Sequence, residues 1–307
     1  MVRRGQPAER VGAESLPDAV LQRLTAARPP VAGLPQGRTA VMGILNVTPD
    51  SFSDGGRHAG AGAAAVAHAM VAAGADIVDV GAESTRPGAA EVSLDDELAR
   101  LAPLLPGLVG LAWSIDTRKP GVMAAALAGG AALVNDVSAL GHDPDSMALV
   151  AARGCPVVLM HAQGTPETMQ LAPHYDDVLL DVYDWLEARI AACEAAGIAR
   201  GRIIVDPGIG FGKNLQHNLA LLRGLTLFHG LGVPLLLGAS RKALISRLAG
   251  EVPGGGRLAG EVPAEARLPG SLALALHAAA CGVQVVRVHD VAETVQALAV
   301  WREAQLS

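Results

Sequence analysis

The chain has 307 residues, of which half are apolar and 18% are charged, so it can bury a substantial core. Its formal net charge of −6 excludes a general binding surface for nucleic acid or anionic membranes. The three cysteines, Cys155, Cys193 and Cys281, form no Cys-x-x-Cys pair, and no apolar run has the length of a signal peptide or membrane span. These features predict a cytoplasmic protein without a structural zinc site, a nucleic-acid partner or a membrane anchor.

Residues 1–37 are rich in proline, arginine and alanine and precede the first apolar run. Leu16, Val20 and Leu24 recur at four-residue spacing, which predicts a short helix within residues 15–28 that covers the bottom of the domain. We interpret residues 1–37 as an N-terminal extension without chemistry of its own, and residues 38–307 as the main domain.

From residue 38 onward one unit repeats: an apolar, β-branched run ends in polar residues, and a segment of helical composition follows. The runs are Thr39–Val47, Asp76–Gly81, Leu111–Thr117, Leu133–Ser138, Pro156–His161, Arg202–Asp206, Pro234–Gly238 and Val283–His289. The intervening helices are predicted over residues 62–74, 94–105, 121–129, 144–153, 176–197, 218–224, 241–250 and 272–282. Eight such units in a chain of this length predict an α/β fold of the (β/α)₈ TIM barrel type.

The alternative fold is an open, doubly wound parallel sheet. It is disfavoured because no Gly-x-Gly-x-x-Gly turn follows the first run, where a dinucleotide-binding fold needs one. Near the end of the chain, Arg247–Pro253 recurs unchanged as Arg257–Pro263. We interpret this duplication as a lengthened surface loop, and a functional lid is the alternative.

The active site of a barrel lies at the carboxyl ends of its strands, and these runs end in charged or amide side chains. Asp116, Asn135 and Asp206, with Lys242 nearby, suit the polar edge of a flat heterocycle that carries several N–H donors. The alternative is that each of these side chains only caps a local turn or helix.

A second group, Asn46, Arg287 and His289, joins the first and last strands, which are neighbours in a closed barrel. A guanidinium, an imidazole and an amide suit phosphate oxygens, and Asn46 with Asp50 or Asp54 suits a Mg²⁺ ion that keeps waters and phosphate ligands. For His289 the alternative is a structural histidine bonded to the neighbouring aspartate.

Two of the three phenylalanines stand in loops, Phe52 after the first strand and Phe211 in the glycine-spaced stretch Asp206–Lys213. In a chain with so few aromatic residues, these positions indicate contact with a flat substrate, or else anchors that hold each loop to the barrel.

Taken together, these motifs resemble the dihydropteroate synthase family of folate-pathway enzymes. The matching segments are Gly43–Gly56, Asp76–Gly88, Ser114–Thr117, Asn135–Val137, Leu159–Gly164, Asp206–Lys213, Ser240–Lys242, Arg267–Gly270 and Arg287–Val291. The resemblance implies a transferase that joins 6-hydroxymethyl-7,8-dihydropterin diphosphate to 4-aminobenzoate, giving 7,8-dihydropteroate and diphosphate. It also implies a (β/α)₈ barrel, a homodimer, a Mg²⁺ requirement and a target of sulfonamides.

The resemblance also assigns site residues. It implies a pterin pocket of Asp116, Asn135, Met160, Asp206, Gly210 and Lys242, a diphosphate and Mg²⁺ site of Asn46, Arg287 and His289, and a 4-aminobenzoate site of Phe52, Thr85, Arg86, Pro87 and Phe211. The catalytic residues that follow are Asp206, Lys242, Asp54 and Arg86. Ala243 departs from the family, in which this position often carries a hydroxyl group or a charge.

Two other functions share parts of this pattern. A pterin-dependent methyltransferase domain has the barrel and much of the pterin pocket, but it has no diphosphate leaving group and leaves Asn46, Arg287 and His289 unexplained. A non-catalytic pterin-binding paralogue would need no complete set of loop and phosphate residues.

Overall fold

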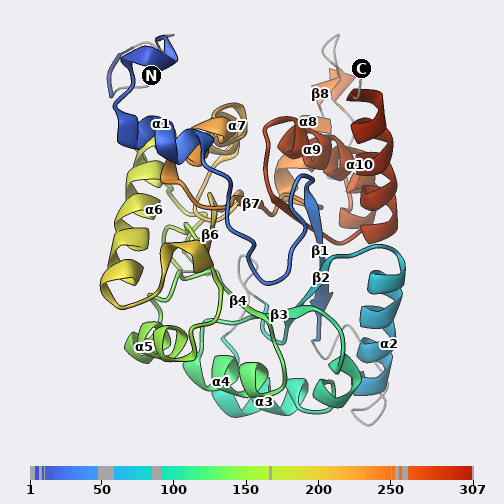
Figure 1. Ribbon diagram of the computed structural model, residues 1–307. Coiled ribbons are helices and arrows are strands. Elements are labelled where there is room, and N and C mark those ends of the chain that lie inside the picture. The colour runs from blue at the N-terminus through green and yellow to red at the C-terminus, as the bar shows by residue number, and fades with distance from the viewer. Residues whose placement is uncertain are drawn as a thin grey trace.

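The computed structural model describes residues 4–6, 9, 11–47, 59–84, 91–165, 168–249, 251–252, 256–257 and 262–305. Within these ranges, eight parallel strands form one sheet that curves into a ring, with helices around its outside (Figure 1). The strands are β1 (Ala40–Asn46), β2 (Ile77–Gly81), β3 (Trp113–Asp116), β4 (Leu133–Asp136), β5 (Val157–Met160), β6 (Ile203–Asp206), β7 (Leu236–Leu237) and β10 (Val285–Val288). Each lies inside one of the eight predicted runs.

The strand order is β6-β5-β4-β3-β2-β1-β10-β7, so the first and last strands are neighbours as expected. The two outermost strands of this order also meet: Val205 and Leu235 form a parallel bridge, and the N–H of Val205 donates to the carbonyl of Pro234 at 3.0 Å. The sheet is therefore a nearly closed (β/α)₈ barrel, and the alternative of an open doubly wound sheet is wrong.

Each predicted helical segment overlaps a helix of the structure. The helices are α1 (Asp18–Thr25), α2 (Ala59–Ala72), α3 (Leu94–Leu101), α4 (Pro120–Ala128), α5 (Pro144–Arg153), α6 (Val178–Ala195), α7 (Leu215–Arg223), α8 (Ala243–Ala249), α9 (Leu268–Ala280) and α10 (Val291–Gln305). The last of them was not among the predicted segments. In the part of the chain that the structure describes, no helix is both long and apolar enough to cross a membrane.

The barrel interior has two layers, because residues two apart in a strand share a face. The lower layer is apolar and consists of Ala40, Met42, Ile77, Leu133, Val158, Ile204, Leu236 and Val285. Two positions further along β2, β4, β6 and β10, the same face carries Asp79, Asn135, Asp206 and Arg287. The apolar layer supports the barrel, and the polar layer above it opens at the carboxyl ends of the strands.

The N-terminal extension contacts the barrel through α1 and through the segments on either side of it. Helix α1 lies against α6 and the 3₁₀ helix η5 (Leu225–Leu231), where Arg23 pairs with Glu187 at 3.1 Å. The segment after α1 places Val31 against the apolar layer, and only 4% of Val31 is exposed. The extension covers the bottom of the barrel as expected, but mainly through this segment rather than through the helix.

The duplicated segment is only partly described. Two residues of its first copy, Glu251–Val252 (β8), pair antiparallel with Gly256–Arg257 (β9). Within the segment that we interpret as a lengthened surface loop, these four residues therefore form a short hairpin.

Candidate active site

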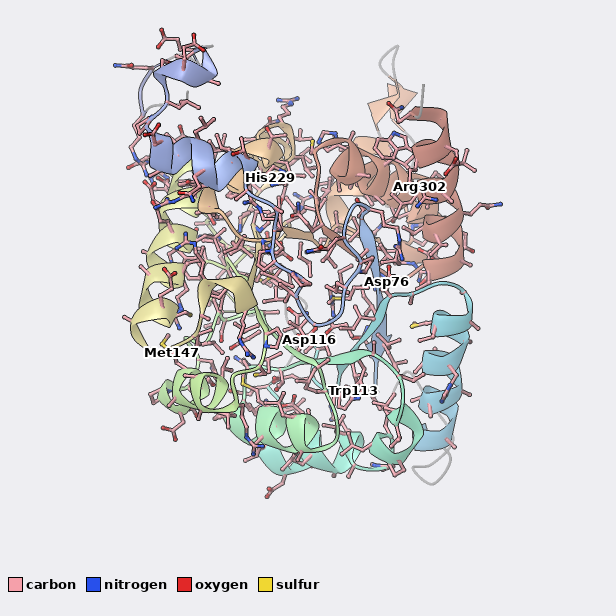
Figure 2. All side chains as sticks on the ribbon, in the orientation of Figure 1. Asp76, Trp113, Asp116, Met147, His229 and Arg302 are labelled. Carbon is pink, nitrogen blue, oxygen red and sulfur yellow. The ribbon has the colours of Figure 1, made fainter. Side chains whose placement is uncertain are left out.

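The carboxyl ends of β1 to β4 lie in register around the barrel mouth. Asn46 pairs with Gly81, Gly81 with Asp116, and Asp116 with Asn135. A Cβ atom on Gly81 would lie 3.4 Å from the Cβ of Asp116 and 3.7 Å from Oδ1 of Asn46. The missing side chain therefore leaves room between these two polar groups, and Figure 2 shows Asp116 in the middle of the ring of strands.

Asp79 holds the centre of the polar layer together. Its buried carboxylate accepts hydrogen bonds from the hydroxyl of Ser114 at 2.6 Å, from Nδ2 of Asn135 at 2.8 Å and from Nε of Arg287 at 2.6 Å. The same guanidinium donates from Nη2 to Oδ2 of Asp116 at 2.7 Å. Four strands, β2, β3, β4 and β10, thus meet in one network of charge-assisted hydrogen bonds.

Two buried carboxylates share the single guanidinium of Arg287, so the network has an excess of negative charge. The pKa of Asp116 is raised to about 7: burial is the largest cause, the nearby charge of Asp79 adds to it, and the attraction of Arg287 opposes both effects. Oδ1 of Asp116 is buried and accepts no hydrogen bond from the described residues. An unpartnered buried acceptor of this kind is suited to an N–H donor of a ligand.

Asn135 is oriented by the same network. Because its NH₂ group donates to Asp79, its carbonyl oxygen is left as the acceptor that the pocket can use. The hydrogen bond to Asp79 therefore sets which atom of the amide meets a ligand. Asn135 and Asp116 together present acceptors to one edge of the pocket.

Asp206 and Lys242 form the opposite wall. Oδ1 of Asp206 accepts the N–H of Gly208 at 2.7 Å, and burial raises the pKa of this carboxyl, opposed chiefly by the charge of Lys242. Burial lowers the pKa of Lys242 to about 8, opposed by the attraction of Asp206. The ammonium donates to the carbonyl of Ile209 and lies 4.3 Å from the centre of the Phe211 ring.

Two glycines and Met160 complete this wall. Gly210 lies under Lys242, since a Cβ atom there would be 3.2 Å from Cδ of the lysine. Gly238 stands between Asp206 and Arg287, with Oδ2 of the aspartate 3.5 Å from its Cβ position. Met160 is the register partner of Asp206 and is 4% exposed. The structure therefore gathers the predicted pterin residues at one end of the barrel.

The three residues predicted to bind the diphosphate, Arg287, His289 and Asn46, differ in their hydrogen-bond partners. Arg287 points into the polar layer and is held by Asp79 and Asp116, so its guanidinium lies within the same network as Asn135. His289 lies two residues further along, where its Nδ1 and its N–H are 3.0 and 3.2 Å from the hydroxyl oxygen of Ser240. The amide of Asn46 has no hydrogen-bond partner within the described ranges.

Five predicted site residues, Phe52, Asp54, Thr85, Arg86 and Pro87, lie outside the described residues, as do Asp50 and the rest of the loop after β1. Ala243, the departure from the family pattern, begins α8 directly after Lys242 and is exposed.

Two important residues, Asp79 and Lys213, were not predicted from the strand ends. Asp79 is two residues before the end of β2, and the signal for it was the two-residue period, which places it on the inward face with Ile77 and Gly81. Lys213 ends the Asp206–Lys213 stretch and contacts His161, which no local pattern indicates.

A cleft of about 630 Å³ lies at the opposite end of the barrel, between β1, α9 and α10, and residues such as Thr39, Val283 and Trp301 line it. Its size does not make it the active site, because the convergent buried charges lie at the carboxyl ends of the strands.

The sequence of this chain is similar to those of known proteins. A model of the family described as pterin binding enzyme covers residues 42–289. The dihydropteroate synthase of Escherichia coli K12 is 50% identical over 272 residues, 87% of this chain and 92% of that protein. The one from Neisseria meningitidis serogroup B is 48% identical, over 85% of this chain and 91% of its own length.

Solved structures agree. The Yersinia pestis dihydropteroate synthase with a sulfonamide drug complex has a TM-score of 0.81 at 44% identity and covers 89% of this chain and 97% of its own. The Xanthomonas albilineans dihydropteroate synthase with 4-aminobenzoic acid has a TM-score of 0.81 at 46% identity, over 92% and 100% of the two chains. The chain belongs to the pterin-binding enzyme family. Its relatives place it among the dihydropteroate synthases, which are transferases.

Proposed function

We propose that the barrel mouth binds 6-hydroxymethyl-7,8-dihydropterin diphosphate and joins it to 4-aminobenzoate, giving 7,8-dihydropteroate and diphosphate. One observation carries this assignment: Oδ1 of Asp116 is a buried acceptor without a donor, beside the oriented amide of Asn135. The Xanthomonas albilineans structure in complex with 7,8-dihydropteroate, 44% identical to this chain, supports the same product.

The pterin ring has N–H donors on one edge and a flat apolar face. Asp116, Asn135 and Asp206 provide acceptors for the donors, and Met160 provides a buried apolar surface for the face. Lys242 provides a donor for a ring acceptor from the opposite wall. Burial makes each of these polar contacts stronger than it would be in water.

In the reaction, the bond between the pterin methylene carbon and the diphosphate oxygen breaks, and its electron pair leaves with diphosphate. Positive charge builds on the methylene carbon and spreads into the ring. Asp206, nearly buried and held by the N–H of Gly208, stabilises that charge. The lone pair of the amino nitrogen of 4-aminobenzoate then forms the new C–N bond. The resulting acidic ammonium loses its proton to water or to the departed diphosphate, so a strong general base is unnecessary.

The leaving diphosphate needs positive charge. His289 lies at the end of β10 above Arg287, and the Nη1 group of Arg287 has no partner within the described ranges. The side-chain amide of Asn46, which has no hydrogen-bond partner within the described ranges, is suited to be one ligand of a Mg²⁺ ion here. A Mg²⁺ ion held by Asn46, waters and phosphate oxygens would neutralise the diphosphate.

The remaining roles rest on the family. Phe52, Thr85, Arg86 and Pro87, with Phe211, surround 4-aminobenzoate, and Asp54 and Arg86 assist catalysis. The protein acts as a homodimer in the cytoplasm, where its three free cysteines stay reduced. Sulfonamides compete for the 4-aminobenzoate site, as the Yersinia pestis structure with a sulfonamide drug complex suggests.

Diphosphate release by the purified protein tests this function. Release is expected only when pterin diphosphate, 4-aminobenzoate and Mg²⁺ are all present. A protein that binds the pterin tightly but never releases diphosphate would be a non-catalytic paralogue. A protein that accepts a methyl group on a bound pterin would be a methyltransferase domain.

A further inference from the structure

Lys213 is a buried ammonium among neutral acceptors. It is 2% exposed, and its Nζ lies 2.9 Å from Nδ1 of His161, 2.9 Å from the carbonyl oxygen of Phe211 and 3.3 Å from the carbonyl oxygen of His161. Within the described ranges it forms no ion pair with a carboxylate. Burial lowers its pKa to about 7. Because burying a charge is costly, these three contacts must compensate for the water that Lys213 loses.

The contacts of Lys213 join the loops that follow β5 and β6. These loops touch through their backbones: Gly208 has a φ of +69°, and a Cβ atom on it would lie 1.9 Å from the carbonyl oxygen of His161. The hydroxyl of Tyr175 also donates to the carbonyl of Gly212 at 2.8 Å. The two loops therefore form one wall, in which Lys213 is the charged link and Tyr175 a neutral one.

The same wall holds the groups that orient Lys242. The carbonyl of Ile209 accepts from its ammonium, and the ring of Phe211 lies below it. Lys213 in turn donates to the carbonyl of Phe211, so a continuous set of contacts connects Lys213 with Lys242 through the loop backbone.

We propose that Lys213 is a positioning residue for the pterin site: by fixing the loop after β6 to His161, it holds Ile209 and Phe211 in the places that orient Lys242. The inference rests on the proposed function of the barrel mouth. It concerns a buried side chain that donates to the carbonyl of Phe211 and acts through Lys242, without contacting the substrate itself.

The first test compares four variants with the wild type by calorimetric binding of pterin diphosphate and by kcat per folded enzyme. Lys213→Met keeps the volume and removes the charge and donors, so the Kd is expected to rise ~10-fold and kcat to fall. Tyr175→Phe removes the neutral link to the same loop and is the matched control, for which both Kd and kcat are expected to change less than ~3-fold. His161→Asn keeps an acceptor near the place of Nδ1, whereas His161→Leu has none.

The conservative pair separates positioning from mere packing. His161→Asn is expected to bind the pterin nearly as the wild type does, and His161→Leu to resemble Lys213→Met. If Lys213→Met folds and keeps the wild-type Kd and kcat, the proposal is overturned. If it does not fold, equal affinities in the two His161 variants overturn it instead.

A spectroscopic measurement needs no activity. Because Nδ1 of His161 accepts from Lys213, its proton is expected on Nε2, and burial together with the charge of Lys213 lowers the ring pKa to about 3. In ¹⁵N-histidine spectra, one ring, assigned by its loss in His161→Asn, is expected to stay neutral and in one tautomer from pH 5 to 8. An unchanged ring signal in Lys213→Met would overturn the link. These readouts remain decisive even if the wild type fails to release diphosphate.

Discussion

Arg287 and Asp116 form an ion pair of 2.7 Å across the barrel mouth, although 171 positions separate them in the chain. The pair connects the last strand to the third and places the guanidinium at the floor of the pterin pocket. Arg287 is therefore expected to support pterin binding and diphosphate binding together, rather than diphosphate binding alone.

The first prediction concerns this pair. Arg287→Met leaves Asp79 and Asp116 buried without their counter-charge and is expected to lower the free energy of unfolding by about 3–5 kcal/mol. The double variant Arg287→Met/Asp116→Asn is compared with the two single variants by urea denaturation at pH 8. Its loss of unfolding free energy should be smaller than the sum of the two single losses, by a coupling energy of about 0.5–3 kcal/mol. Strict additivity would show that the pair does not interact.

The second prediction follows from the raised pKa of Asp116. Its folded pKa of about 7 exceeds the usual value, so the folded state binds more protons than the unfolded state between about pH 4 and 7. This group therefore contributes stability at low pH that is lost as the pH rises through 7. Between about pH 4 and 7, the free energy of unfolding should fall less steeply with rising pH in Asp116→Asn than in the wild type. Equal slopes for the two proteins would contradict the raised pKa of Asp116.

The third prediction concerns the turn after β6. Gly208→Ala must accommodate a positive φ and a methyl group 1.9 Å from the carbonyl oxygen of His161, so the loop must move. A loss of about 2–4 kcal/mol in unfolding free energy is expected. Gly110→Ala is the control, because Gly110 also has a positive φ but nothing lies within 4 Å of its Cβ position. Similar losses in both variants would mean that the contact with His161 is unimportant.

Much of the fold could be predicted from the sequence, because each strand is a continuous apolar run and each run ends in polar residues. The positions of Asp116, Asn135 and Asp206 at one end of the barrel follow from that pattern alone. The role of Asp79 did not follow, because it lies inside β2, and only the pairing of strands shows that Ser114, Asn135 and Arg287 converge on it.

Two other features depend on distant contacts. The ion pair of Arg287 with Asp79 spans 208 residues, and the link of Lys213 to His161 spans 52, so no local spacing indicates either one. Helix α10 follows the last strand and completes the eighth unit, but the helices were predicted only between successive strands.

The fourth prediction separates catalysis from binding. Asp206→Asn keeps the shape of the side chain and the N–H contact with Gly208 but removes the negative charge. The value of kcat is expected to fall at least ~10²- to 10³-fold, since the charge acts on the transition state. The far-ultraviolet circular dichroism spectrum, which reports secondary structure, should not change. Asp95→Asn on the exposed face of α3 is the control, and retained turnover in Asp206→Asn would remove its catalytic role.

The central claim is that the polar layer at the carboxyl ends of the strands binds the pterin, with Oδ1 of Asp116 as its unpartnered acceptor. Calorimetric titration of the wild type and of Asp116→Asn with pterin diphosphate at pH 8 tests it most directly. Loss of a charged acceptor should weaken binding ~10- to 100-fold, while Asp95→Asn binds as the wild type does. Equal affinities for the wild type and Asp116→Asn would contradict the claim.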